Sequence, residues 1–211
     1  VLVFCFIVSS LGITSLAATP ENETEPLSII NKDLKTGKTE IITISDSEAC
    51  DFAPSYIPNE RRIKSGRSII DDVDERSRVS KSLMSYFPYS ATVLIIARFD
   101  DGTSTMGTGW LFGSNDVATA AHVLVENGVM ASEVTVYTGV NGSSFSGNPS
   151  YTVTDVEEFY IPVQFKDLVN DNFDYAFIKL DQNIGDSLGY YGWSTAGGVN
   201  SFAMIVGYPG E

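Results

Sequence analysis

Short apolar runs separated by Gly, Asn, Asp and Ser fill the chain beyond Pro88. Runs of this length, bounded by turn residues, are typical of β-strands. The expected strands are residues 89–99, 109–112, 116–119, 133–138, 151–156, 175–180 and 202–206. No convincing amphipathic helix interrupts them. The pattern therefore predicts an all-β domain.

Residues 18–67 are mostly polar and weakly periodic, as linkers and propeptides are. One strand-like patch, formed by Ile41, Ile42 and Ile44, predicts that part of this region pairs with another strand. The region ends in a basic cluster consisting of Arg61, Arg62, Lys64 and Arg67. This cluster is either a processing site, cut after Arg67 to free Ser68, or a solvated basic stretch.

Residues 1–17 open with a continuous apolar run and continue into small residues. The run is too short to span a bilayer, so we expect a signal peptide cleaved after Ala17 and no stable membrane anchor. A buried core helix or a membrane anchor is the alternative. The sequence starts with Val1 rather than Met, and no basic segment stands before the apolar run. We therefore expect the natural chain to start further upstream. Cleavage of the signal peptide would also remove Cys5, so Cys50 would have no cysteine in the mature chain with which to form a disulfide.

The formal net charge of −14 and the isoelectric point near 4.3 disfavour nucleic acid as a partner, since phosphate binding needs clustered Lys and Arg. Four acidic residues stand close together at Asp71, Asp72, Asp74 and Glu75, but their spacing matches no EF-hand loop and favours a solvated acidic stretch. We expect neither a metal ion nor a cofactor.

His122 is the only histidine of the chain and stands at the end of an apolar stretch, after Ala120 and Ala121. Such small residues allow the backbone to pack closely and to aim an imidazole into a cleft, as a general base requires. A single histidine, taken without its context, is also compatible with a structural or surface role.

Asp174 immediately precedes the apolar strand expected at 175–180. Burying a charged carboxylate costs several kcal/mol unless it is hydrogen-bonded, and an imidazole N–H is one suitable partner. In a Ser-His-Asp triad, the aspartate fixes the histidine tautomer and stabilises the imidazolium. Asp171 is the competing acid, although a turn or helix cap explains it more simply.

Several blocks in this order resemble the trypsin-fold peptidases of the bacterial glutamyl endopeptidase group. The strongest are Gly107-Thr108-Gly109-Trp110-Leu111-Phe112-Gly113, Val117-Ala118-Thr119-Ala120-Ala121-His122 and Asp174-Tyr175-Ala176-Phe177-Ile178. Weaker blocks lie at 68–70, 76–79, 184–192 and 206–210. The resemblance covers residues 68–211.

The resemblance implies a chymotrypsin-like double β-barrel, of which the chain holds the N-terminal barrel and the start of the second. It also implies the catalytic order His, Asp, Ser, with His122 and Asp174 as the first two members. The Gly-x-Ser-Gly motif of the nucleophile is absent from the sequence, so we expect the serine beyond Glu211. Ser194 and Ser201 lack glycines on both sides and are not candidates.

Some relatives in this group carry a cysteine pair that bridges the strand before the histidine to the residue after it. This chain has Gly107 and Val123 at those positions, so packing must hold the site. The resemblance also implies a preference for Glu or Asp at the cleaved bond, assisted by a mature N-terminus at Ser68. An aromatic run, formed by Tyr190, Tyr191 and Trp193, either lines a peptide groove or packs between domains.

The sequence thus predicts a signal peptide at 1–17, a propeptide at 18–67 and part of a peptidase domain at 68–211. The expected protein is a secreted, monomeric serine endopeptidase made as a zymogen. Its partners would be protein or peptide substrates and its own propeptide as an inhibitor. The alternative is a non-catalytic extracellular binding module on the same barrel scaffold.

Overall fold

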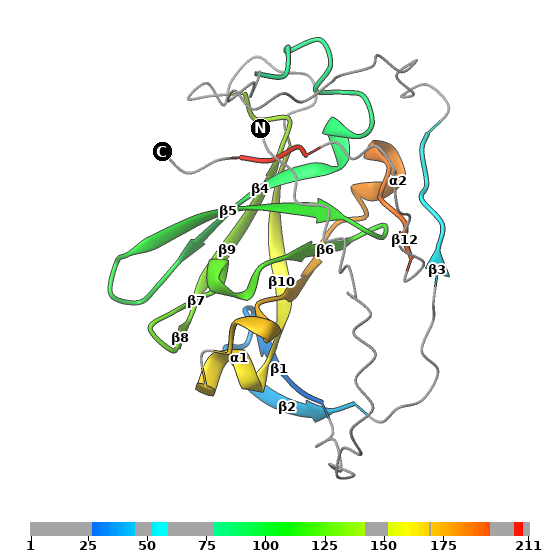
Figure 1. Ribbon diagram of the computed structural model, residues 1–211. Helices are drawn as coiled ribbons and strands as arrows, with labels where there is room; N and C mark the ends of the chain where they lie inside the picture. Colours follow the sequence, from blue (N-terminus) through cyan, green and yellow to red (C-terminus); the bar gives the residue numbers. More distant parts are fainter. Residues whose placement is uncertain are drawn as a thin grey trace, which may run out of the picture.

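The computed structural model describes residues 27–44, 52–58, 78–141, 152–168, 170–194 and 205–208. The strands are β1 (Ser28–Asp33), β2 (Thr39–Thr43), β3 (Phe52–Ala53), β4 (Thr92–Arg98), β5 (Ser104–Leu111), β6 (Asp116–Thr119), β7 (Val125–Glu126), β8 (Val129–Met130), β9 (Glu133–Thr138), β10 (Thr152–Pro162), β11 (Ala176–Leu180) and β12 (Trp193–Ser194). The helices are short: α1 (Val163–Leu168), α2 (Gly185–Leu188) and the 3-10 turns η2 (Tyr89–Ala91), η3 (Ala121–Val123) and η4 (Asp171–Phe173). Figure 1 shows their arrangement.

Six antiparallel strands form a closed barrel in the order β11-β6-β5-β4-β9-β10, and β10 pairs back onto β11 to complete it. Each of these six strands therefore pairs with another barrel strand on both of its edges over at least part of its length. The prediction of an all-β fold is confirmed, and the described residues contain one closed six-stranded barrel.

The observed strands differ from the predicted ones mainly in length. β5 begins at Ser104 because it pairs with β4 from the turn onward. β10 runs six residues beyond the predicted end at Val156, to Pro162, and its register shifts between Val156 and Glu158. Of the strand expected at 202–206, only residues 205 and 206 are described, and neither lies in a strand.

Alternate side chains of the barrel strands point inward and form the core. The buried inward residues include Val93, Ile95, Ala97, Val134, Val136, Phe159, Ile161, Ile178 and Leu180. Gly109 lies where a side chain has no room, because a Cβ there would stand 2.7 Å from both Ile95 Cδ1 and Val117 Cγ1. Burial of these apolar groups supplies the main driving force for the fold.

Two stretches upstream of the barrel domain also pair with it (Figure 1). β1 and β2 form a hairpin that extends the sheet from β10. The predicted strand around Ile41 and Ile42 is confirmed as β2, although its direct partner is β1. Further along, β3 pairs with β12.

The predicted signal peptide, both cysteines, the basic cluster before Ser68 and the acidic residues 71–75 lie outside the described residues. Within the part of the chain that is described, no helix has the length and apolar character needed to cross a membrane.

The barrel interior should not accept a methyl group at Gly109. We expect Gly109→Ala to lower the free energy of unfolding by about 1–3 kcal/mol, because the added Cβ overlaps two core side chains. Urea denaturation of the purified protein measures this. Ser104→Ala, at the exposed start of β5, is the control and should change stability by less than about 0.5 kcal/mol. Equal stability of the two variants would contradict the packing argument.

Candidate active site

His122 projects from η3, a single turn that directly follows β6. This turn packs against the core through three buried side chains, those of Ala121, Val123 and Leu124. Its backbone closes through bonds from Val123 N to Ala120 O at 3.2 Å and from Leu124 N to Ala121 O at 2.9 Å. The His122 side chain, by contrast, is 66% exposed. The apolar neighbours therefore fix the backbone while the imidazole stays accessible.

Asp174 ends the η4 turn and stands just before β11. The Asn170 side chain caps that turn by accepting a hydrogen bond from Asn172 N at 3.1 Å. The Asp174 amide donates to Asp171 O at 3.2 Å, which gives Asp171 the backbone role in a turn that the sequence suggested. The Asp174 side chain is 28% exposed. It is therefore only partly withdrawn from solvent.

The pairing of β6 with β11 brings the two residues together. Thr119, the last residue of β6, lies opposite Ala176, the first of β11. In an antiparallel pair, the segments just beyond these facing ends occupy the same end of the sheet. His122 and Asp174 both lie in those segments, although they are 52 residues apart in the chain.

Asp174 binds His122 through both of its carboxylate oxygens. Oδ1 accepts the backbone N–H of His122 at 2.9 Å, and Oδ2 lies 2.7 Å from the ring Nδ1. A carboxylate at this distance favours the tautomer whose proton is on Nδ1. The lone pair then remains on Nε2. An imidazole in this state can accept a proton from a hydroxyl group that faces Nε2.

Two threonines support the site, and the sequence reasoning did not find them. Thr105 Oγ1 donates to Val123 O at 2.6 Å and so ties β5 to the histidine turn. Thr108 O accepts from Thr119 Oγ1 at 2.9 Å, and Thr108 Oγ1 accepts from Tyr208 N at 2.7 Å. Both threonines lie in β5, where threonine is common, so nothing in the local sequence marked them.

Val123 packs directly over Gly107, at the two positions where some relatives carry a cysteine pair. A Cβ on Gly107 would stand 2.9 Å from Val123 Cγ1 and 3.2 Å from Val123 Cβ. The valine side chain thus fills the space left by the missing side chain of Gly107. Packing takes the place of a covalent link here, as the sequence indicated.

The remaining predicted residues lie elsewhere. Ser194 is in β12, opposite Phe52, and Ser201 lies outside the described residues. In the aromatic run, Tyr190 contacts Tyr56 with ring centroids 5.4 Å apart, and Tyr191 contacts Phe87 at 5.0 Å. Trp193 is exposed. No three His, Cys, Asp or Glu side chains gather into a metal-binding group within the described ranges.

The sequence matches the family described as Trypsin over residues 79–210. It is 35% identical over 144 residues to a glutamyl endopeptidase of Bacillus licheniformis, which covers 65% of this chain and 41% of that protein. It is also 35% identical over 148 residues to an extracellular metalloprotease of Bacillus subtilis, which covers 67% of this chain and 45% of that protein. The matched part is thus less than half the length of either relative.

A solved structure titled "Structure of Glu endopeptidase in complex with MPD" is similar as well. It has a TM-score of 0.45 and 27% sequence identity, and the match covers 58% of this chain and 53% of that chain.

A disulfide should form between positions 107 and 123 when both carry cysteine. A Cβ on Gly107 would stand 3.2 Å from Val123 Cβ, so the two segments need to separate by only a few tenths of an ångström to reach the usual Cβ–Cβ distance of a disulfide, about 3.5–4.5 Å. We therefore expect Gly107→Cys combined with Val123→Cys, in a Cys50→Ser background, to oxidise spontaneously. Closing a loop of this size should raise the free energy of unfolding by about 1–3 kcal/mol. Thiol titration and urea denaturation measure the two effects. The same protein under reductant is the control, and two persistently free thiols would contradict the expected geometry.

Proposed function

This chain belongs to the trypsin family of peptidases, and we propose that it forms the first barrel of a secreted serine endopeptidase with His122 as general base and Asp174 as its orienting carboxylate. The two-point contact between Asp174 and His122 carries the proposal. This contact fixes both the backbone and the ring of the histidine, whereas an ordinary surface ion pair joins only the two charged side-chain groups.

In the proposed reaction, a serine hydroxyl gives its proton to His122 Nε2 while its oxygen attacks the peptide carbonyl carbon. The imidazolium then donates that proton to the leaving amine nitrogen. Asp174 stabilises the positive charge through Nδ1 and prevents the ring from turning. We propose that the serine and its oxyanion-hole amides belong to a part of the protein beyond Glu211. The greater length of both Bacillus relatives supports this.

We further propose that the protein is made as a zymogen and exported, with residues 1–17 as signal and 18–67 as propeptide. The apolar start of the chain and the basic cluster before Ser68 support this organisation. The similarity to the Bacillus subtilis protein, which is named an extracellular metalloprotease, supports the export part of this proposal.

The full-length protein should lose its activity when either residue of the pair is changed. We expect His122→Ala and Asp174→Asn each to lower kcat/KM on a peptide substrate by roughly 10³-fold or more, because the base is removed or its tautomer is wrong. Asp171→Asn is the matched control, since it alters a carboxylate of the same turn while leaving the two-point contact intact.

Undiminished peptidase activity of the His122→Ala protein would refute the assignment. So would equal losses for Asp171→Asn and Asp174→Asn. Absence of peptidase activity from the unmodified full-length protein would favour the binding module.

The mature enzyme should prefer an acidic residue before the cleaved bond. A carboxylate there would pair with the positive charge of the new amino terminus at Ser68. We expect kcat/KM to be roughly tenfold or more higher for a Glu peptide than for the matched Gln peptide, the value of one charge-assisted hydrogen bond. Steady-state kinetics on the two peptides measure this ratio. Equal rates would exclude the proposed specificity.

A further inference from the structure

The hairpin of β1 and β2 pairs with the outer part of one barrel strand, β10. β9 pairs with β10 over residues 152–155, and β1 pairs with it from Glu158 to Pro162. Phe159 of β10 lies opposite Lys32 of β1 and also opposite Ile178 of β11, so β1 and β11 occupy the two edges of β10. The hairpin therefore covers a stretch of backbone that β9 leaves unpaired.

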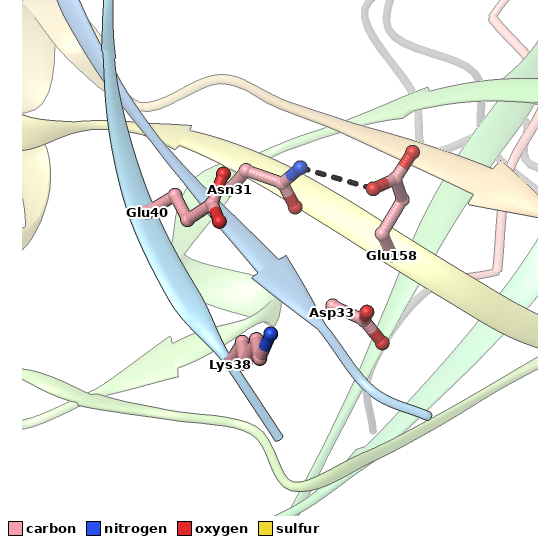
Figure 2. Close-up of a pocket in the computed structure, with 5 residues that line it drawn as sticks. All are labelled: Asn31, Asp33, Lys38, Glu40 and Glu158. Atoms are coloured by element: carbon pink, nitrogen blue, oxygen red, sulfur yellow. Dashed lines mark hydrogen bonds between the residues drawn. The ribbon is translucent and has the colours of Figure 1, made fainter. Parts of the chain in front are cut away.

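Side chains strengthen this contact. Ile30 of β1 is buried in the barrel core. Asn31 Nδ2 donates to Glu158 Oε2 at 2.9 Å, beside a pocket between the hairpin and β10 (Figure 2). Tyr160 OH donates to Glu158 Oε1 at 2.7 Å. Partial burial, helped by this bond, raises the pKa of Tyr160 to about 12.

The hairpin also supports the turn that presents Asp174. β1 contacts α1, and α1 contacts η4. Within this contact, Asn170 N donates to Gln164 O at 3.4 Å. Asp174 follows at the end of η4. The hairpin is thus connected to the proposed active site through one helix, without lying over it.

Residues 52–58 make a second, separate contact with the barrel domain. Tyr56 and Tyr190 exchange both of their backbone hydrogen bonds, at 3.0 and 2.9 Å, and β3 pairs with β12 beside them. Two glycines make the close approach possible. A Cβ on Gly192 would stand 2.5 Å from Ser55 N, and one on Gly189 would stand 2.9 Å from Tyr56 O. The surface therefore accepts a main chain where any side chain would exclude it.

Neither contact covers the histidine. With both described stretches in place, the His122 side chain is still 66% exposed. The surface that holds the N-terminal segment is therefore distinct from the imidazole face at which chemistry is proposed.

We propose that residues 27–44 and 52–58 form a clamp on the barrel, bound by strand addition at β10 and at residues 189–194, and that this clamp remains bound as a separate chain after cleavage near Arg67. Its partner is the mature barrel of the same protein. This inference rests on the proposed function only in taking residues 18–67 as a propeptide. Main-chain pairing at two edges provides affinity without occupying the His122 side of the barrel.

Hydrogen exchange in the full-length precursor tests the contact at 189–194. His122→Ala is introduced throughout to prevent self-cleavage. Tyr56→Pro removes the N–H that donates to Tyr190 O, whereas Tyr56→Phe keeps both the N–H and the ring. We expect exchange at residues 189–194 to become about tenfold faster in the proline variant and to stay unchanged in the phenylalanine variant. Equal exchange in both variants would overturn the proposal.

Ile30→Asp tests the hairpin independently. It places a charge in the core beside β10, so we expect faster exchange at 158–162 and unchanged exchange at 189–194. Position 30 precedes the cleavage site, as position 56 does, so the polypeptide from Ser68 onward has the same sequence in every variant. No change at 158–162 would refute the β10 part of the clamp.

Retention after cleavage is tested by replacing residues 60–66 with the recognition sequence of a site-specific protease. After the cut, the N-terminal fragment should elute with the barrel in size exclusion, and it should separate when Ile30→Asp and Tyr56→Pro are combined. Separation of the unmodified fragment would refute retention.

Neither the exchange assay nor the size-exclusion assay needs peptidase activity. An inactive protein with a bound clamp would therefore disprove the proposed function alone, and an active protein without a bound clamp would disprove the clamp alone.

Discussion

The antiparallel register between β6 and β11 determines where the candidate site forms. Thr119 pairs with Ala176 at the last position of β6 and the first position of β11. The chain therefore forms a short turn next to each strand at the same end of the barrel. Those turns carry His122 and Asp174. A slip of one residue would send the core side chains of β11 to the outside, so burial of Ile178 and Leu180 protects the register. The same burial that stabilises the barrel therefore positions the pair.

Local contacts then hold the histidine turn in place without a covalent link. Val123 fills the space above Gly107, and its carbonyl accepts the Thr105 hydroxyl. The apolar contact packs the histidine turn against β5, and the hydrogen bond links the backbone of the turn to the side chain of a β5 residue. Because both contacts involve Val123, the residue next to His122, they restrict the backbone and leave the Nε2 side of the ring accessible. That division suits a group that must exchange protons with a substrate.

The sequence predicted the parts of this structure that local patterns encode. Short apolar runs bounded by turn residues marked the barrel strands, and the motifs around His122 and Asp174 identified the pair that the structure brings together. The extension of β10 was missed because Glu157 and Glu158 interrupt the apolar pattern. Their carboxylates bond to Lys35 and Asn31, more than 120 residues away, and no local window contains both partners. The roles of Thr105 and Thr108 likewise depend on distant backbone groups.

Strand addition is a suitable way to hold a segment in place without a covalent link. Its affinity comes mainly from backbone groups, so the barrel can present its own edge without a dedicated side-chain pocket. Gly189 and Gly192 meet that requirement at one edge, where any Cβ would collide with the incoming backbone. At the other edge, Ile30 adds apolar burial and Asn31 adds a bond to Glu158. The N-terminal segment thus pairs with the part of the β10 backbone that β9 leaves open, beside the helix that supports the turn of Asp174.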